Sequence, residues 1–198
     1  MTGFLQALEA QRHDDHRYYH HSTVNQTLHF MSACTFLASY VMLFTHPVVA
    51  VLVGWVVAMV SRQIGHFFFE PKGYDAINQA THAEKEAIKL GYNLRRKAIL
   101  MAVWIASPLV VLVEWIVAPP ADPADLLRHL AIIWAAIAFI ALLGRAAQLC
   151  IVKDVRTGVA WFVKILTDPF HDIKLYHRAP LHLLRGRLLD PETPAVAR

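Results

Sequence analysis

The sequence predicts an all-α integral membrane protein, a bundle of four transmembrane helices with an interfacial amphipathic helix in its C-terminal tail. Three observations support this fold class. Of the 198 residues, 56% are hydrophobic and 17% are charged, whereas soluble domains have about 45–50% apolar and about 25% charged residues. The mean hydropathy is +0.38. Finally, the apolar residues lie in four long runs with basic residues at their ends. At this length we expect a single domain, residues 1–198.

The four apolar runs are predicted to cross the membrane because they have 17 to 23 residues each. About 20 apolar residues in a helix cross roughly 30 Å of hydrocarbon. None of the runs has the continuous polar face that a helix of a soluble bundle needs. Pro108, inside the third run, predicts a kink. The predicted spans are Leu28–Phe44, Val48–Phe69, Ile99–Val117 and Leu130–Val152.

Basic residues predict the orientation of these spans. They are concentrated in the N-terminal segment, in the loop between the second and third spans, and in the tail 153–198, whereas the opposite side has only Arg128. By the positive-inside rule, both termini and the middle loop are cytoplasmic. This places the chain in the inner membrane of a bacterium or in the endoplasmic reticulum of a eukaryote. The net charge of +4 therefore reflects membrane topology, and we expect no nucleic-acid partner.

Two segments outside the spans also have helical patterns. Thr81–Lys97 is predicted to be one helix, with Thr81 as N-cap and Glu84 three residues later. Val155–Thr167 has apolar residues at helical spacing and is predicted to lie as an amphipathic helix in the membrane interface. Asp168-Pro169 is expected to end that helix.

Histidine is unusually frequent, and its distribution indicates a metal site. Ten of the 12 histidines fall on the predicted cytoplasmic face, in three separated segments. Imidazole is the commonest metal ligand in proteins. His20 and His21 cannot point the same way from a regular helix, and His29 lies about 12 Å beyond His21 along a continuous one. One metal could bind both only if the chain breaks, and Ser22–Asn25 offers a cap where a break could occur.

His66 and Glu70 form a second element of the predicted site. They are four residues apart, so both project from one helix face, and Gly65 permits a neighbouring helix to approach closely. Two imidazoles and one carboxylate with open positions form the arrangement by which Fe(II) oxygenases bind oxygen and substrate. Glu70 is thus a candidate ligand or proton acceptor.

Further candidates come from the middle loop, the tail and two intramembrane arginines. The tail supplies His171 and His177, with Asp172 placed to orient an imidazole. Arg62 and Arg145 lie at similar depth and could hold a carboxylate bidentately or extend to lipid phosphates. The candidate metal ligands are His20, His21, His29, His66, His82, His171 and His177.

Two motifs resemble the fungal 2-hydroxy fatty acid dioxygenase family. Tyr19-His20-His21, followed by Asn25 and His29, is similar to the N-terminal motif of that family, and Gly65–Glu70 is similar to its Gly-His-x-x-Phe-Glu. The family consists of small multispan membrane proteins that require Fe(II) and shorten a 2-hydroxy fatty acid by one carbon, with oxygen consumed. The resemblance implies His20, His21, His29 and His66 as ligands. The segment 71–75 and the tail 168–191 depart from the family pattern.

The sequence therefore favours an iron-dependent oxygenase that acts on a lipid-soluble substrate, most simply a 2-hydroxy fatty acid, with Fe(II) as cofactor and with O₂ and membrane lipids as partners. One alternative is a di-iron membrane hydroxylase or desaturase, because His16-x-x-x-His20-His21 resembles one of the histidine boxes of those enzymes. Another is a non-enzymatic haem- or metal-binding membrane subunit. The oligomeric state stays open, and a homo-oligomer is among the options.

Overall fold

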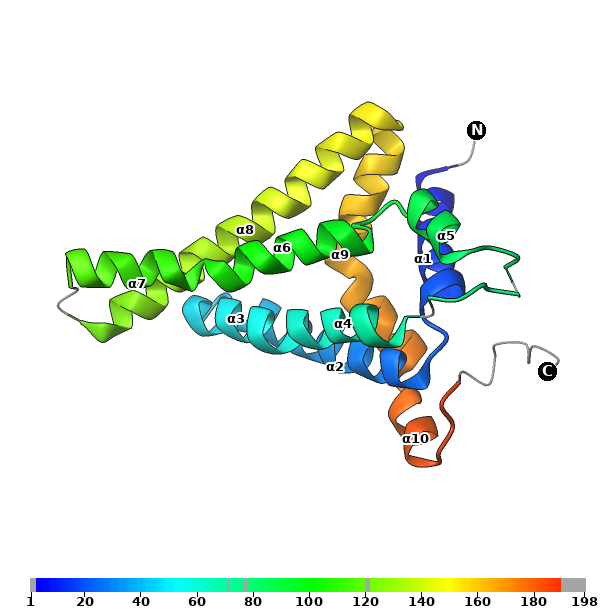
Figure 1. The fold of residues 1–198 in the computed structure, drawn as a ribbon, viewed down its shortest axis with the longest axis horizontal. Coiled ribbons are helices and arrows are strands. Elements are labelled where there is room, and N and C mark those ends of the chain that lie inside the picture. The colour runs from blue at the N-terminus through cyan, green and yellow to red at the C-terminus, as the bar shows by residue number, and fades with distance from the viewer. Residues whose placement is uncertain (1–2, 71, 77, 120–121, 190–198) are drawn as a thin grey trace.

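The computed structural model describes residues 3–70, 72–76, 78–119 and 122–189, and every regular element among them is helical. The all-α prediction is confirmed for this part of the chain. The long helices lie close together at one end of the molecule and spread apart toward the other end, where shorter and transverse helices meet them (Figure 1).

Three helices are long and apolar enough to cross a membrane, as the sequence predicts for its second, third and fourth spans. The first of them, Pro47–Phe69, contains two π-helical stretches, whereas the second, Leu94–Val117, has a break at Ser107 where Pro108 starts a new segment. The interruption thus lies directly before Pro108, the residue at which the sequence predicts a kink. The segments are α3 (Pro47–Val53), η1 (Gly54–Met59), α4 (Val60–Ile64) and η2 (Gly65–Phe69), then α6 (Leu94–Ala106) and α7 (Pro108–Val117), and finally α8 (Pro123–Val152).

The first predicted span lies in α2 (Thr23–Met42), which is not one of these three helices. Its polar residues lower its hydropathy, and they are the residues it buries: Thr23, Asn25, Gln26, His29, Ser32 and Ser39. The helix nevertheless runs alongside α3 and α4 (Figure 1). Its exposed side chains include Met31 and Val41. Helix α2 therefore has a polar face inside the protein and apolar residues outside it.

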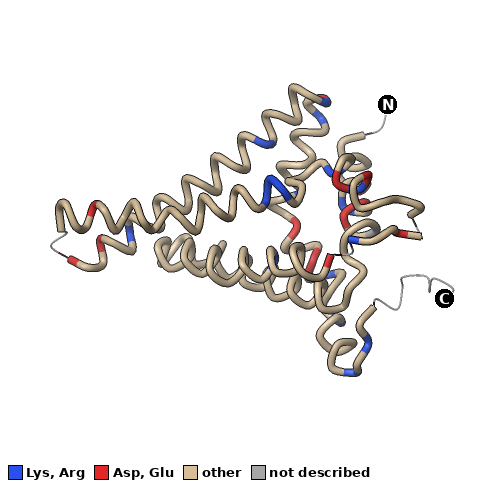
Figure 2. Tube along the Cα trace, viewed as in Figure 1, with Lys and Arg blue, Asp and Glu red and all other residues tan. Residues whose placement is uncertain are grey.

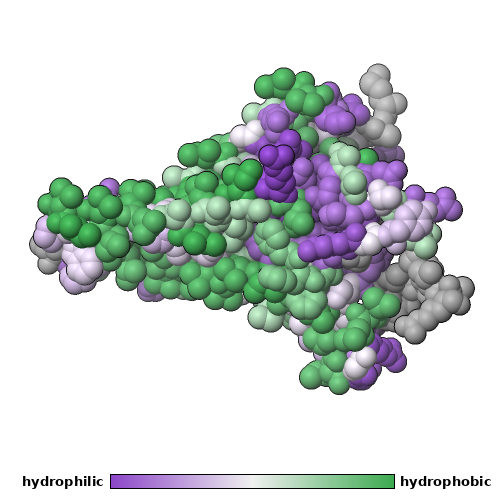
Figure 3. Space-filling model, in the orientation of Figure 1, coloured by the Kyte–Doolittle hydropathy of each residue, from purple (hydrophilic) through white to green (hydrophobic). Residues whose placement is uncertain are grey.

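The surface divides into an apolar part and a charged part. Apolar surface covers the long helices, whereas polar surface gathers over α1 (Phe4–Tyr19), α5 (His82–Ile88) and the start of α6 (Figure 3). Most charged residues lie at that same end (Figure 2). Only 11% of the most apolar window is buried in both Leu94–Val117 and Pro123–Val152. Such extensive exposed apolar surface is typical of contact with lipid.

A tryptophan cluster packs three of the long helices together. Trp55, Trp104 and Trp134 are buried against one another, and the rings of Trp55 and Trp104 are stacked with centroids 5.3 Å apart. Their indole N–H groups also contribute, because Trp55 donates to the carbonyl of Trp134 at 3.0 Å and Trp134 donates to the Ser107 hydroxyl at 2.9 Å. The cluster thus joins η1, α6 and α8 at the α6–α7 break.

Helix α9 (Val155–Tyr176) runs crosswise to the long helices, together with α1 (Figure 1). It begins at the N-cap Asp154, whose side chain accepts from the Thr157 amide. The prediction that Asp168-Pro169 ends this helix is wrong, because α9 continues through Pro169 to Tyr176. A proline inside a helix costs about 3 kcal/mol. Here the helix is held on both sides of Pro169 by buried ion pairs of Asp168 and Asp172. The short α10 (Ala179–Leu184) follows.

The predicted helix Thr81–Lys97 is split in two. Its start is confirmed, since Thr81 and Glu84 form a capping box at the beginning of α5. However, α5 ends at Ile88, and α6 begins after a second N-cap, Asn93, whose side chain accepts from the Arg96 amide. The capping chemistry of Asn93 competes with helix continuation, which explains why the single-helix prediction is wrong.

Candidate metal centre

A break between α1 and α2 places His20 opposite His29. Helix α1 ends at Tyr19, and the Ser22 side chain caps α2. The first turn of α2 secures the intervening residues, because Asn25 donates to the Tyr19 carbonyl at 3.1 Å and Gln26 donates to the His20 carbonyl at 2.9 Å. The chain therefore breaks at Ser22, within the segment where the sequence predicts a break. The histidine that this break places beside His29 is His20, whereas His21 was the one considered from the sequence.

Gly65 lets η2 approach α2 closely enough to bring in His66. A Cβ atom on Gly65 would clash with Oδ1 of Asn25 and would lie 3.4 Å from Cδ2 of His29. Only glycine leaves this space, so the backbone of η2 can pack directly on α2. His66 follows Gly65 within the π-helical turn. Such turns inside helices are frequent at functional sites.

His20, His29 and His66 form a buried group, which we call the histidine triad. One ring nitrogen from each lies within 4.8 Å of those of the other two. The ring centroids are 4.1 Å apart for His20 and His29, 4.9 Å for His29 and His66, and 5.6 Å for His20 and His66. Within the described ranges it is the only cluster of three or more histidine, cysteine or acidic side chains with this geometry.

Each imidazole of the triad has an oxygen atom beside its Nδ1. The Tyr176 hydroxyl lies 2.8 Å from His20 Nδ1, and Oε2 of Glu70 lies 3.3 Å from His66 Nδ1. Oδ2 of Asp172 lies 3.6 Å from His29 Nδ1. Metal-bound histidines characteristically direct their second nitrogen at a carboxylate or another oxygen, which fixes the tautomer and orientation of the ring. Tyr176 therefore engages Nδ1 of His20, whereas Nδ1 of His29 and Nδ1 of His66 lie beside carboxylates without forming a hydrogen bond.

The unpaired nitrogens of the triad fit a cation. Nε2 of His20 and Nε2 of His29 are buried and have no hydrogen-bond partner among the described residues. Burying a polar atom without a partner is costly, and a metal ion would provide the missing one. Burial lowers the pKa of His20 well below its usual range, and His29 adds to this effect. His20 is therefore neutral near pH 7, which is the protonation state that a metal ligand needs.

Buried ion pairs surround the triad. Arg62 donates to Asp172 at 2.9 Å, and its guanidinium lies 3.7 Å from Asp168. Lys164 contacts Asp168 at 2.7 Å and Asp15 at 2.5 Å, which links α9 to α1. Burial lowers the pKa of Lys164, but the two carboxylates outweigh burial and raise it above its usual value. These pairs hold Asp172 in place behind His29.

Glu70 and Arg62, both candidate catalytic residues, are engaged within the protein. Besides facing His66, the Glu70 carboxylate accepts from Lys89 at 2.9 Å, and it is buried. Glu70 does not belong to the triad, so the structure presents three imidazoles where the sequence suggested two imidazoles and a carboxylate. Arg62 is paired with Asp172 and Asp168. Glu70 and Arg62 thus position other groups of the site.

The remaining candidate ligands lie apart from the triad. Nε2 of His21 is 3.8 Å from Asp75, so this ring faces the middle loop. His82 is the first residue of α5, and His171 is half-buried on α9. His177 is exposed, and its Nδ1 lies 3.0 Å from the Lys174 carbonyl. None of the four joins a group of three ligands within the described residues.

Arg145 binds backbone rather than facing a cavity. Its guanidinium donates twice to the Leu90 carbonyl, at 2.9 and 2.6 Å, and also to Gly91 at 3.3 Å. A further bond of 2.7 Å goes to the Gln148 side chain. Arg145 therefore holds the connection between α5 and α6 against α8, and the predicted contact with a substrate carboxylate is not what its surroundings suggest.

We accordingly expect Arg145→Met to lower stability while leaving substrate affinity unchanged. The substitution removes hydrogen bonds from a charged donor, each worth about 1.5–3 kcal/mol, but touches nothing in the triad. Thermal unfolding in detergent and the KM for substrate would measure the two effects. A large rise in KM at unchanged stability would show that Arg145 binds substrate after all.

A cavity of about 330 Å³ opens beside the triad between the long helices. We call it the central cavity. His20 and His66 line one end of it, together with several charged side chains, and the other end lies among apolar residues of η1, α6 and α8. Trp55 of the tryptophan cluster lines that inner end. A mostly apolar pocket with a few polar groups at one end is typical of a small-molecule site.

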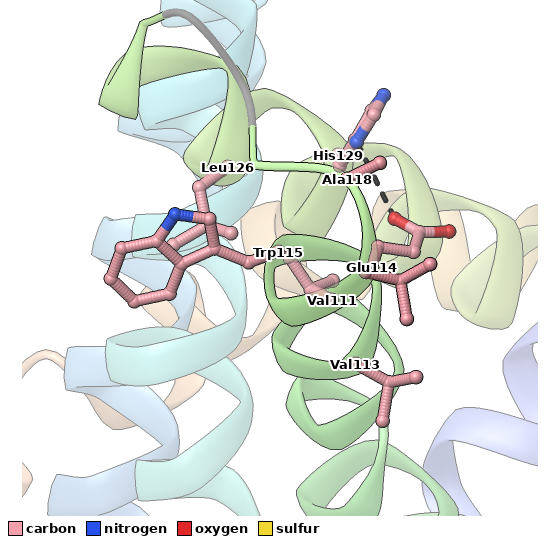
Figure 4. A pocket seen from close by; sticks show the side chains of 8 residues that line it. Val111, Val113, Glu114, Trp115, Ala118, Leu126 and His129 are labelled. Atoms are coloured by element: carbon pink, nitrogen blue, oxygen red, sulfur yellow. Dashed lines mark ion pairs between the residues drawn. The ribbon is translucent and has the colours of Figure 1, made fainter.

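A second pocket, of about 420 Å³, lies at the opposite end of the long helices (Figure 4). Val111, Trp115 and Leu126 line it, and its His129 and Glu114 are 3.6 Å apart. These two side chains do not form part of a three-ligand group. The central cavity, which adjoins the triad, is therefore the better candidate for a reaction site.

No family model, curated protein or solved structure matches this chain. Inference about function thus starts from the triad, its oxygen partners and the central cavity. Sequence reasoning did not single out Tyr176 or Lys97, which both lie at this site. Tyr176 is 156 residues from His20, so no local spacing in the sequence could have joined them.

Proposed function

We propose that this protein is a membrane-embedded, iron-dependent oxygenase whose metal is held by His20, His29 and His66. The reaction that the sequence motifs favour is oxidative one-carbon shortening of a 2-hydroxy fatty acid. The observation that carries the proposal is the buried triad, with an oxygen atom near Nδ1 of each ring and with His20 and His66 lining the central cavity. Fe(II), when bound, would supply the oxidising chemistry by activating O₂ next to the substrate.

The donor set and the sequence motifs both favour iron. Imidazole ligands suit zinc, copper, iron and nickel, so the donors alone leave several metals open. The three histidines of the triad are among the four that the resemblance to the 2-hydroxy fatty acid dioxygenase family implies. That family requires Fe(II), and the resemblance therefore selects iron from the metals that the donors accept.

The surrounding residues prepare the site without taking part in the oxidation. Tyr176 lies within hydrogen-bond distance of His20 Nδ1, and the carboxylates of Glu70 and Asp172 lie 3.3 and 3.6 Å from Nδ1 of His66 and of His29. Arg62 compensates the charge of Asp172. The apolar wall of the central cavity limits the access of water and suits an alkyl chain. Each of these roles can be altered without removing a metal ligand.

The proposed membrane arrangement has four spans, with α2 as the first. Helix α2 lies along α3 and α4 (Figure 1) and exposes apolar side chains. Its buried polar face would serve the metal site, as intramembrane polar residues generally do. Helices α1 and α9 then lie across the cytoplasmic interface, and both termini are cytoplasmic. A substrate dissolved in the bilayer would reach the triad from the side.

Elemental analysis and oxygen uptake test this function together. We expect the full chain, purified in detergent, to hold about one iron, the stoichiometry of a mononuclear site, and to consume O₂ when 2-hydroxypalmitate is added. Chelation should stop the uptake, and Fe(II) but not Zn(II) should restore it. Two irons per chain would favour the di-iron alternative. A strong Soret band, or iron-free protein with no uptake, would overturn the proposal.

A further inference from the structure

Four cationic side chains line the central cavity, and three of them are paired. Arg62 is bound to Asp172, Lys164 to Asp168, and Lys89 to Glu70. The fourth is Lys97. Among the residues that the structure describes, no carboxylate lies within 4.0 Å of its ammonium and no side-chain hydrogen bond satisfies it. The cavity thus contains one cation that the protein itself does not neutralise.

Lys97 lines the same cavity as His20 and His66 of the triad. It lies in the first turns of α6, where basic residues mark the start of that helix (Figure 2). Its side chain is partly buried. Withdrawing a cation from water without a partner costs several kcal/mol. A ligand with a negative group beside Lys97 would offset that cost.

Arg62 and Arg145, the two arginines that the sequence suggests for binding a carboxylate, are already engaged by other groups of the protein. Arg62 is bound to Asp172, and Arg145 is bound to the backbone of the α5–α6 connection. The charge of Arg62 is thus already paired with Asp172 and Asp168, and Arg145 does not line the cavity. Among the cationic side chains that line the cavity, Lys97 is the one without a partner among the described residues, and it is therefore the candidate to bind an acidic head group.

We propose that Lys97 binds the carboxylate of an acid with a long alkyl chain and so positions that acid beside the triad. This inference rests on the proposed function and assigns its head-group recognition. Lysine is a compact charge with three donors, so it can hold a carboxylate that also approaches a neighbouring metal. The alkyl chain would extend along Met59, Leu100 and Leu142 toward Trp55, which all line the cavity.

A comparison of an acid with the alcohol of equal length tests Lys97. The full chain in phosphatidylcholine nanodiscs would be titrated with hexadecanoate and with hexadecan-1-ol, neither of which carries a 2-hydroxyl group. We expect the wild type to bind the acid roughly 10–100-fold more tightly, as expected for hydrogen bonds to a charged group. Lys97→Met and Lys97→Gln should abolish most of this preference, whereas Lys97→Arg should keep it. Bound iron should stay at the wild-type level in all three variants.

Lys153→Met is the matched control, because Lys153 is exposed at the end of α8. It should bind both ligands as the wild type does. If Lys97→Met and Lys97→Gln fold, hold iron and still prefer the acid, Lys97 is not the head-group residue, and iron-dependent O₂ uptake by the wild type would leave the proposed function standing. If the wild type shows neither a preference for the acid nor iron-dependent uptake, the inference and the proposed function both fail.

Discussion

Replacing His29 by alanine is expected to remove bound iron and abolish oxygen uptake. His29 is fully buried, and its ring lies between those of His20 and His66. Even loss of an outer partner of a metal ligand costs about 10–100-fold in affinity, so loss of one of three ligands should lower iron affinity by at least ~100-fold. His20→Ala and His66→Ala should behave in the same way. Iron per chain after desalting, and turnover with 2-hydroxypalmitate, measure the effect.

His21→Ala and His177→Ala are the controls for the triad. His21 is a ligand candidate by resemblance, but its ring is near Asp75, and His177 is exposed on the tail. Both variants should keep wild-type iron content. The opposite pattern, with iron lost from His21→Ala and retained in His29→Ala, would show that the three buried imidazoles are not the metal site.

The second, third and fourth predicted spans agree with the three helices that are long and apolar enough to cross a membrane, because each is a continuous apolar run in the sequence. The first predicted span lies in α2, which is not among the three helices apolar enough to cross a membrane, because it carries buried polar residues such as Asn25 and His29. A hydropathy pattern averages over the polar and the apolar faces of such a helix, so it cannot show which residues are buried. A similar conflict explains Pro169, because its local preference to end the helix is outweighed by ion pairs that join α9 to Arg62 of α4 and to Asp15 of α1.

The spacing of the histidines along the sequence identifies the candidate ligands but does not show which of them come together in the fold. The motif residues His20, His29 and His66 could be proposed from the sequence, but His21 could not be separated from them. The separation depends on the direction in which the chain turns at the α1–α2 break, which Asn25 and Gln26 determine through hydrogen bonds to backbone carbonyls. Tyr176 and Asp172 reach the triad from α9, and such distant pairings depend on tertiary packing alone.

Gly65→Ala is expected to disturb the metal site without changing any side chain that faces the metal. The added methyl group would clash with Oδ1 of Asn25 and push η2 away from α2, moving His66 from His29. Overpacking of this kind costs about 1–3 kcal/mol. Thermal unfolding in detergent should show the destabilisation, and iron content should fall with it. Gly144→Ala is the control, because a Cβ atom there meets nothing within 4 Å, and alanine in a helix interior is up to about 1 kcal/mol more favourable than glycine.

A double-mutant cycle separates this clash from other effects of the methyl group. Asn25→Ala removes the obstructing oxygen but also the hydrogen bond to the Tyr19 carbonyl, which costs about 0.5–1.5 kcal/mol. If the Asn25 side chain is what limits the approach of η2, Gly65→Ala should cost clearly less in the Asn25→Ala background than in the wild type, because the two residues are in contact and their effects are not additive. Equal costs in both backgrounds would mean that His29, rather than Asn25, requires the glycine. In either case the backbone of η2 must lie against α2 for three imidazoles from separate segments to reach one metal.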